Sequence, residues 1–148
     1  MMQSPPRISL WKCIIKYIKK YLSVVIIPTI PFNGIRVSCY RLIGYKIGKG
    51  TFIGMRCYLD DLGFDMIEIG EHVTISYGVY FACHGINQDH HKIIIRDGAY
   101  IGMRTSIIAP SDIEIGERSI IGAGTLVNRS IPDHSVAVGV PCRILDKK

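Results

Sequence analysis

The stretch IGERSIIGAGTLV, residues 115–127, places an aliphatic side chain at every sixth position. Ile115, Ile121 and Val127 carry this period, and glycine directly follows each of the two isoleucines. A period of six matches neither the 3.6 residues of a helical turn nor the two residues of a simple strand. It is typical of a short strand that turns a corner every six residues, so the stretch predicts a solenoid.

The same spacing recurs through most of the chain before this stretch. Three further runs share it: Ile47, Ile53 and Leu59; Ile69, Ile75 and Phe81; Ile95, Ile101 and Ile107. Three short strands make one triangular coil of about eighteen residues, and coils stacked about 4.8 Å apart pair each backbone with the next. We therefore expect an all-β solenoid with these residues inside and with glycine relieving crowding at the corners. Four small side chains are expected to share the interior: Thr51, Thr105, Ser119 and Thr125.

Length and composition restrict the chain to one compact domain. Its 148 residues are 48% apolar and 20% charged, which excludes a disordered chain, and the uncharged apolar stretches are too short for a membrane span. Five cysteines without CxxC spacing argue against a disulfide framework or a zinc site. A cytoplasmic location is expected.

Positive charge is concentrated at the N-terminus. Residues 1–30 carry +5 with no acidic residue, and the rest of the chain carries +1. The sequence contains no RNP, zinc-finger or helix-turn-helix pattern, so nucleic acid is not an expected partner. We divide the chain into residues 1–40, a basic amphipathic helix with a proline-containing connector, and residues 41–148, the solenoid with its C-terminal tail.

The N-terminal segment predicts a helix over residues 8–27 that ends at Pro28. Two sets of side chains recur in steps of four on opposite faces: Leu10, Ile14, Ile18 and Leu22, and Lys12, Lys16 and Lys20. Two interpretations stay open. The helix covers one end of the core with its lysines in water, or its two faces serve an outside partner, either anionic lipid at the inner membrane face or an acidic protein.

Residues 40–145 resemble the hexapeptide-repeat acyltransferases, which fold as left-handed parallel β-helices. The stretch IGERSIIGAGTLVNRSIPDHSVAVGVPCRIL, residues 115–145, is similar to the last coil and tail of the maltose, galactoside and nodulation-factor O-acetyltransferases. Two earlier stretches, RLIGYKIGKGTFIG at 41–54 and MIEIGEHVTISYGVYFACHG at 66–85, resemble the branch that acetylates sugars in polysaccharide synthesis. The resemblance implies a left-handed parallel β-helix, acetyl-CoA as donor, a sugar hydroxyl as acceptor and a homotrimer with sites between subunits.

The resemblance also implies a catalytic residue. His84, in the stretch Ala82-Cys83-His84-Gly85, matches the family position of the catalytic histidine. An imidazole with an ordinary pKa near 6.5 can take the acceptor proton at neutral pH. Adjacent residues of an extended chain point to opposite sides, so Cys83 is expected to be a shielded thiol and not a nucleophile.

Further candidates surround this histidine and the last coils. Asp60, Asp61, His90 and His91 lie in the two insertions that interrupt the period, where they either contact the acceptor or face solvent. For CoA, the resemblance points to six residues: Gly102, Met103, Ala123, Asn128, Arg129 and Arg143. No catalytic metal is expected, because His84, His90 and His91 crowd one loop, whereas the metal ligands of related carbonic anhydrases come from separate coils.

Three alternatives stay open. The same scaffold could acetylate an amino sugar or serine, because acceptor choice depends on loop shape. It could also serve as a noncatalytic scaffold, because the repeat indicates a fold more strongly than a chemistry.

Overall fold

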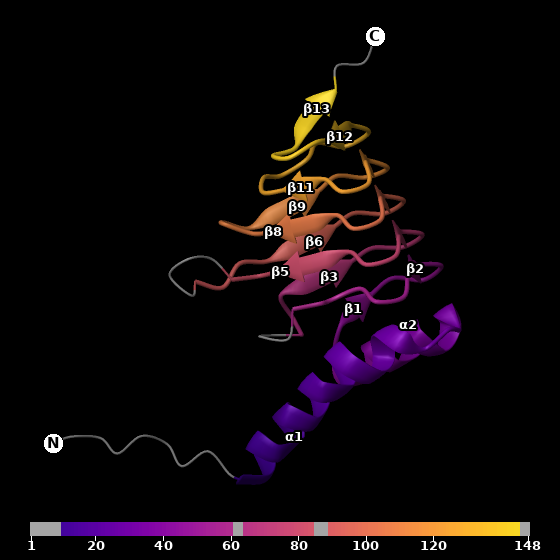
Figure 1. Cartoon of the computed structure of the whole chain (residues 1–148), viewed down its shortest axis with the longest axis vertical. Coiled ribbons are helices and arrows are strands. Elements are labelled where there is room, and N and C mark those ends of the chain that lie inside the picture. The colour runs from indigo at the N-terminus through magenta and orange to yellow at the C-terminus, as the bar shows by residue number, and fades with distance from the viewer. Residues whose placement is uncertain (1–9, 61–63, 85–88, 146–148) are drawn as a thin grey trace, which may run out of the picture.

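The computed structural model describes residues 10–60, 64–84 and 89–145. Three sheets enclose a triangular prism, with the N-terminal helices at one end and the C-terminal strand at the other (Figure 1). Sheet A contains β1 (Lys46–Ile47), β3 (Ile67–Ile69), β6 (Ile93–Ile95) and β9 (Ile113–Ile115). Sheet B contains β2 (Phe52–Ile53), β4 (Thr74–Ile75), β7 (Tyr100–Ile101), β10 (Ile120–Ile121), β12 (Val136–Val138) and β13 (Arg143–Leu145). Sheet C contains β5 (Tyr80–Ala82), β8 (Ser106–Ile108) and β11 (Leu126–Val127).

The residues of the six-residue period stack in register, as predicted. On sheet A, Ile47 pairs with Ile69, Ile69 with Ile95 and Ile95 with Ile115, and every strand pair except the last, β12 with β13, is parallel. The stacked side chains are buried, apart from Ile47, which is half-buried beside the N-terminal helices. Burying an isoleucine contributes about 1.5–3 kcal/mol, so these ladders stabilise the whole prism.

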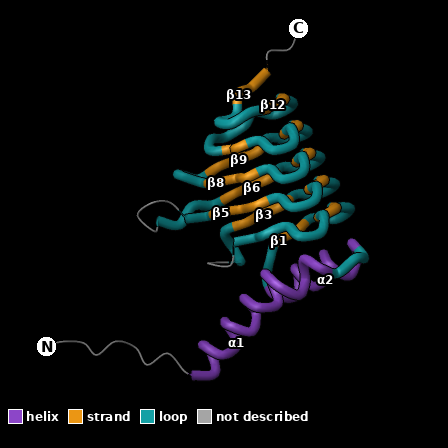
Figure 2. Tube along the Cα trace, in the orientation of Figure 1, coloured by secondary structure: helices purple, strands orange, loops and turns teal. Residues whose placement is uncertain are grey.

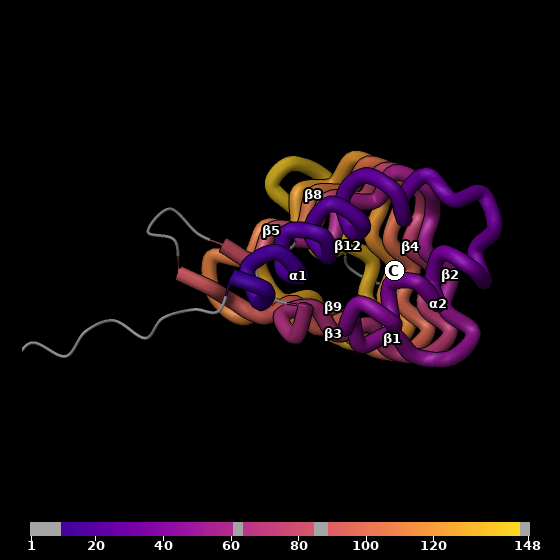
Figure 3. Tube along the Cα trace, turned by 90° about the horizontal axis from the view of Figure 1, so that it is seen from below, coloured from indigo at the N-terminus to yellow at the C-terminus, as the bar shows by residue number. Residues whose placement is uncertain are grey.

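The coil is left-handed. Seen from the N-terminal end, the chain passes from sheet A to sheet B to sheet C counterclockwise as it recedes from the viewer (Figure 3). This direction agrees with the resemblance and differs from the right-handed preference of ordinary parallel crossovers.

The corners of the prism depend on glycine, as predicted. A Cβ atom on Gly102 would lie 2.5 Å from the Ala123 nitrogen, and one on Gly116 would lie 2.3 Å from the Asp133 nitrogen. The four small residues expected inside are buried. Thr51, for example, donates a 2.7 Å hydrogen bond to the Gly70 carbonyl oxygen of the next coil.

From residue 10 onward, two α-helices, not one, precede the prism (Figure 2). The first, α1 (Leu10–Tyr21), continues through a π-helical turn at Leu22–Ile26 and a 3-10 turn at Ile27–Thr29. The expected end near Pro28 is confirmed. The expected connector, however, contains α2 (Asn33–Ile43), whose side chains Val37, Tyr40 and Ile43 join the solenoid core.

The helix α1 does not cover the core. None of its residues is buried, so the first part of the predicted helix does not pack on the prism. The turns that continue it do, because Leu22 packs against the core and Ser23 and Ile27 are buried, and α2 covers the same end of the prism. Within residues 10–60, 64–84 and 89–145, no helix has the length and apolar character needed to cross a membrane.

Candidate active site

His84 and Asp60 meet where the chain passes from sheet C back to sheet A, which we call the C–A corner. Nδ1 of His84 lies 2.8 Å from Oδ2 of Asp60. The Asp60 side chain is 1% exposed and that of His84 is 43% exposed. An ionised carboxylate can only accept, so the imidazole donates from Nδ1, and in the neutral imidazole this tautomer leaves the lone pair on Nε2. The pair therefore presents a histidine oriented by a carboxylate that is shielded from water.

Two further residues hold Asp60, Cys83 at its carboxylate and Tyr45 at its backbone. Oδ2 of Asp60 accepts a 2.7 Å hydrogen bond from the Cys83 amide, which fixes the carboxylate against the strand that leads to His84. The Tyr45 hydroxyl lies 3.1 Å from the Leu59 carbonyl oxygen and 3.2 Å from that of Asp60. It is also 3.0 Å from the Ser23 hydroxyl. The carboxylate thus belongs to a rigid hydrogen-bonded shell.

Asp60 was expected in a loop, contacting acceptor hydroxyls or solvent. The structure contradicts a solvated position, because Asp60 is fully buried and its Oδ2 is shared by His84 and Cys83. Its neighbour Asp61 lies outside the described residues.

Cys83 is shielded, as expected. Its side chain is buried, and burial, followed by the nearby Asp60 carboxylate, raises the pKa of the thiol to about 12. A thiol of this kind stays protonated at neutral pH, so it is a poor nucleophile.

His90 and His91 return to the same corner. His90 forms an isolated antiparallel bridge with His84, and the His91 amide donates a 2.7 Å hydrogen bond to the Cys83 carbonyl oxygen. Nδ1 of His91 lies 3.8 Å from Oδ1 of Asp112, on the next coil. The three histidines are therefore brought together, with His84 tied to the buried carboxylate.

The residues predicted for CoA lie on two edges of the prism. Asn128 and Arg129 are exposed and follow β11, so they lie on the C–A corner two strands beyond His84. The others lie at the corner between sheets B and C, which we call the B–C corner. Met103 is 53% exposed there. Gly102 is stacked against Ala123 of the next coil. Arg143 begins β13 and pairs with Val138, the last residue of β12, across the turn that joins these two strands.

The width of sheet C separates these two edges. Ala123 on one edge and Asn128 on the other are five residues apart, and a strand advances about 3.3 Å per residue, so the edges lie roughly 16 Å apart. One chain therefore does not bring the whole predicted CoA set to His84.

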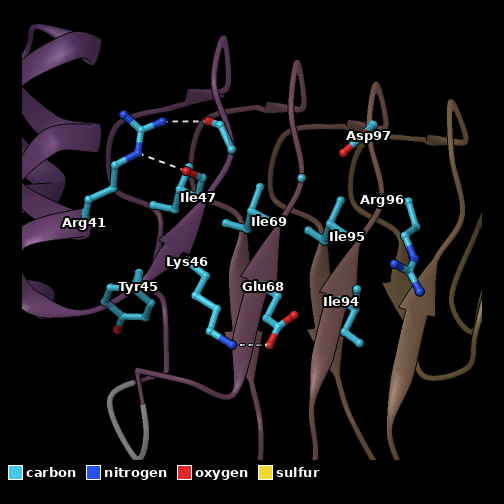
Figure 4. Close-up of a pocket in the computed structure, with 12 residues that line it drawn as sticks. Arg41, Tyr45, Lys46, Ile47, Glu68, Ile69, Ile94, Ile95, Arg96 and Asp97 are labelled. Carbon is cyan, nitrogen blue, oxygen red and sulfur yellow. Dashed lines mark hydrogen bonds and ion pairs between the residues drawn. The ribbon is translucent and has the colours of Figure 1, made fainter.

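A groove of about 520 Å³ on sheet A is not the predicted site (Figure 4). Its charged groups are already paired, since Lys46 Nζ lies 2.7 Å from Glu68 Oε1 and Arg41 binds the Ile47 and Gly48 carbonyl oxygens. The hydrogen bond from Lys46 lowers the pKa of Glu68, which makes this carboxylate a weaker base. The groove therefore lacks a proton acceptor comparable to His84.

The described residues contain no cluster of three or more His, Cys, Asp or Glu side chains arranged to hold a metal ion.

The sequence matches a known family profile and several curated proteins. The profile described as the hexapeptide repeat of succinyl-transferase matches residues 45–81 and 92–129. The bifunctional protein GlmU of Rubrobacter xylanophilus is 35% identical over 108 residues, which cover 69% of this chain and 22% of that protein. The putative acetyltransferase YvoF of Bacillus subtilis is 28% identical over 138 residues, which cover 90% of this chain and 79% of that protein. The chain thus spans about a fifth of the first relative and most of the second.

Solved structures share the fold. A hexapeptide-repeat acetyltransferase from Vibrio cholerae superposes with a TM-score of 0.75 at 23% identity, covering 94% of this chain and 93% of that one, and it has also been solved with acetyl-CoA. A maltose O-acetyltransferase from Clostridium difficile gives a TM-score of 0.72 at 24% identity over 93% and 88% of the two chains. Soybean serine acetyltransferase superposes with a TM-score of 0.59 at 23% identity, covering 90% of this chain and 55% of that one.

Proposed function

Because the chain belongs to the hexapeptide-repeat acyltransferase family, we propose that it transfers an acetyl group from acetyl-CoA to a sugar hydroxyl. The observation that carries this proposal is the His84–Asp60 pair. A half-exposed imidazole, held at 2.8 Å by a buried carboxylate, is the arrangement that general-base catalysis of acyl transfer requires.

The reaction needs one proton acceptor and no covalent intermediate. His84 Nε2 removes the proton of the acceptor hydroxyl while its oxygen attacks the thioester carbonyl carbon. The C–S bond then breaks, and the imidazolium returns its proton to the departing CoA thiolate, so the histidine is regenerated. Asp60 keeps the Nδ1 proton in place and stabilises the imidazolium formed between these steps.

The donor is acetyl-CoA, as the acetyltransferases among the relatives support. Backbone groups near Gly102 and Ala123 would flank the pantetheine arm along the B–C corner. Arg143, and Arg129 on the other edge, would meet the phosphates, since a guanidinium binds phosphate oxygens bidentately.

A homotrimer would bring the two edges together. In the part of the solenoid that the structure describes, every strongly exposed large apolar side chain lies on sheet B, on sheet C or at the B–C corner: Phe52, Tyr77, Tyr80, Tyr100, Met103, Ile108, Ile120, Val140, Ile144 and Leu145. The outward face of sheet A carries three charged residues, Lys46, Glu68 and Glu114, and the half-buried Ile94 between the two glutamates. Apolar surface of this extent favours contact with another subunit. The B–C corner of one copy would then face the His84 corner of its neighbour.

The acceptor is a sugar hydroxyl, free or lipid-linked, in polysaccharide or glycan assembly. The support is the sequence resemblance to sugar O-acetyltransferases. Serine or an amino sugar is the alternative acceptor, and thiol release measured over a panel of sugars, nucleotide sugars and amino acids distinguishes them. Absence of turnover with every acceptor would favour a noncatalytic scaffold.

Replacing His84 tests the proposal. His84→Asn removes the base while its side-chain amide can still donate to Asp60, so the fold should be retained. Loss of a general base lowers turnover by about 100- to 10,000-fold. Thiol release from acetyl-CoA measures the effect on the acceptor that the panel identifies.

The matched control is His134→Asn. It removes an exposed imidazole from a corner turn far from Asp60, and asparagine tolerates the positive φ of 54° found there. This variant should keep wild-type turnover. Equal turnover of His84→Asn and wild type would show that the base lies elsewhere.

A further inference from the structure

The apolar face of α1 is turned away from the protein. Leu10 is 76% exposed, Trp11 73% and Tyr17 71%. Ile14, Ile15, Ile18 and Tyr21 are also exposed, and no side chain of α1 is buried. A water-facing helix normally presents its polar side, so this face is built to be covered by a partner.

The lysines of α1 lie on its other side. With 100° per residue, Lys12, Lys16, Lys19 and Lys20 fall within a sector of about 100° that contains no apolar residue of the exposed face. Lys19 fixes the helix to the body, since its Nζ lies 3.4 Å from the Ile43 carbonyl oxygen and 5.6 Å from the centre of the Phe64 ring. This anchoring turns the basic side toward the protein and leaves the apolar side outward.

We propose that α1 is an interfacial helix that docks the protein on an anionic lipid surface. Charge selects this occupant, because residues 1–30 carry +5 with no acidic group. The rest of the chain carries +1, so a second copy offers no matching excess of acidic charge. The lysines lie opposite the apolar face, so their long side chains must extend around the helix to reach lipid phosphates, while tryptophan and tyrosine suit the boundary between headgroups and acyl chains.

The helix lies on the bilayer and does not cross it. Although the helical run continues to Thr29, α1 carries four lysines, and no described helix is both long and apolar enough to cross a hydrocarbon core of about 30 Å. Binding of this kind combines burial of apolar surface with attraction between basic residues and anionic headgroups.

Docking would bring the His84 corner toward the membrane. In the two perpendicular views, α1 extends on the same side as β5, the strand that directly precedes Cys83 and His84 (Figures 1 and 3). Contacts also join the two regions, because Ser23, shortly after α1, bonds Tyr45, which reaches the Asp60 carbonyl oxygen. This consequence rests on the proposed function, and it favours an acceptor sugar that is carried on a lipid.

Flotation of the full-length protein with vesicles tests the docking directly. Wild type should float with vesicles of phosphatidylcholine and phosphatidylglycerol at about 0.1 M salt, and much less with phosphatidylcholine alone or at high salt. Each lysine near an anionic surface contributes about fivefold to partitioning onto the vesicles. The triple substitution of Lys12, Lys16 and Lys20 by Gln should therefore lower the partitioning about 100-fold. Ile15→Ser should lower it about tenfold or more through lost apolar burial.

Matched substitutions on the solenoid give the controls. Lys49→Gln removes one exposed body charge and should leave flotation unchanged, whereas Lys16→Gln should reduce it about fivefold. Ile94→Ser replaces a half-buried apolar side chain on the outward face of sheet A, outside both α1 and the proposed subunit contact, and should also leave flotation unchanged.

Two results would overturn the proposal. One is flotation that is absent or indifferent to lipid charge. The other is a change in oligomeric mass by light scattering in the α1 variants without any vesicle binding, which would assign the apolar face to a second copy. Flotation needs no turnover, so His84→Asn should float like wild type even if the proposed chemistry fails.

Discussion

The imidazole of His84 is tied through Nδ1 to a carboxylate that water does not reach. Asp60→Asn preserves the shape of this contact, because the amide oxygen can still accept from both His84 and the Cys83 amide. It removes the negative charge that stabilises the imidazolium. A charge-assisted hydrogen bond contributes about 1.5–3 kcal/mol, so kcat should fall roughly 10- to 100-fold with little change in KM for acetyl-CoA.

Asp112→Asn is the control for this residue. Asp112 is exposed, accepts from the Lys92 amide and lies 3.8 Å from His91, so its loss should change kcat by no more than about threefold. Equal losses in the two variants would show that His84 does not depend on Asp60.

Cys83 provides a second test at the scale of one residue. Burial raises its pKa to about 12, so the thiol stays protonated below that pH and reacts only as the pH approaches it. Iodoacetamide at pH 8 should label the half-buried Cys13 and Cys39 and leave Cys83 unlabelled, as judged by mass spectrometry. Labelling of Cys83 at the rate of a free thiol would mean that the site is open to solvent and would revive a nucleophilic role.

At the scale of the element, glycines of two kinds can be compared. Gly116→Ala would place a Cβ atom 2.3 Å from the Asp133 backbone nitrogen of the next coil and should cost about 1–3 kcal/mol. Gly34 lies in α2 with no atom within 4 Å of the added Cβ, so Gly34→Ala should stabilise by up to about 1 kcal/mol. Thermal melting measures both, and destabilisation by Gly34→Ala equal to that by Gly116→Ala would contradict the stacking described for this corner.

The elements differ in how far the sequence alone could predict them. The six-residue period fixed the stacked strands and buried ladders, because every coil repeats the same local environment. The helix α2 escaped prediction, since prolines around residue 30 suggested a connector. For α1, the amphipathic pattern indicated two faces, but which face is covered depends on the anchoring of Lys19 to Ile43 and Phe64, which no local pattern records.

The contact of His84 with Asp60 could not be predicted from spacing. The two residues are 24 positions apart, and the insertions that follow each of them break the regular period. Their meeting depends on how adjacent coils stack, which brings both insertions to one corner. The available signal was an aspartate, Asp60, directly after a residue of the six-residue period. The sequence does not distinguish such an aspartate, buried in the structure, from a solvated loop residue.

At the scale of the whole molecule, the candidate site is divided between edges. His84, Asn128 and Arg129 lie on the C–A corner, whereas Met103 and Ala123 lie on the B–C corner. Two copies arranged edge to edge would complete the proposed site, and the apolar surface of sheets B and C would be covered in the same assembly.

A crystal structure of the wild-type protein with bound CoA tests the central proposal most directly. We expect the CoA sulfur within about 4 Å of His84 Nε2, with the pantetheine arm along the B–C corner of a neighbouring copy. A sulfur in the groove on sheet A, or anywhere beyond the reach of His84, would contradict the assignment of this histidine as the base.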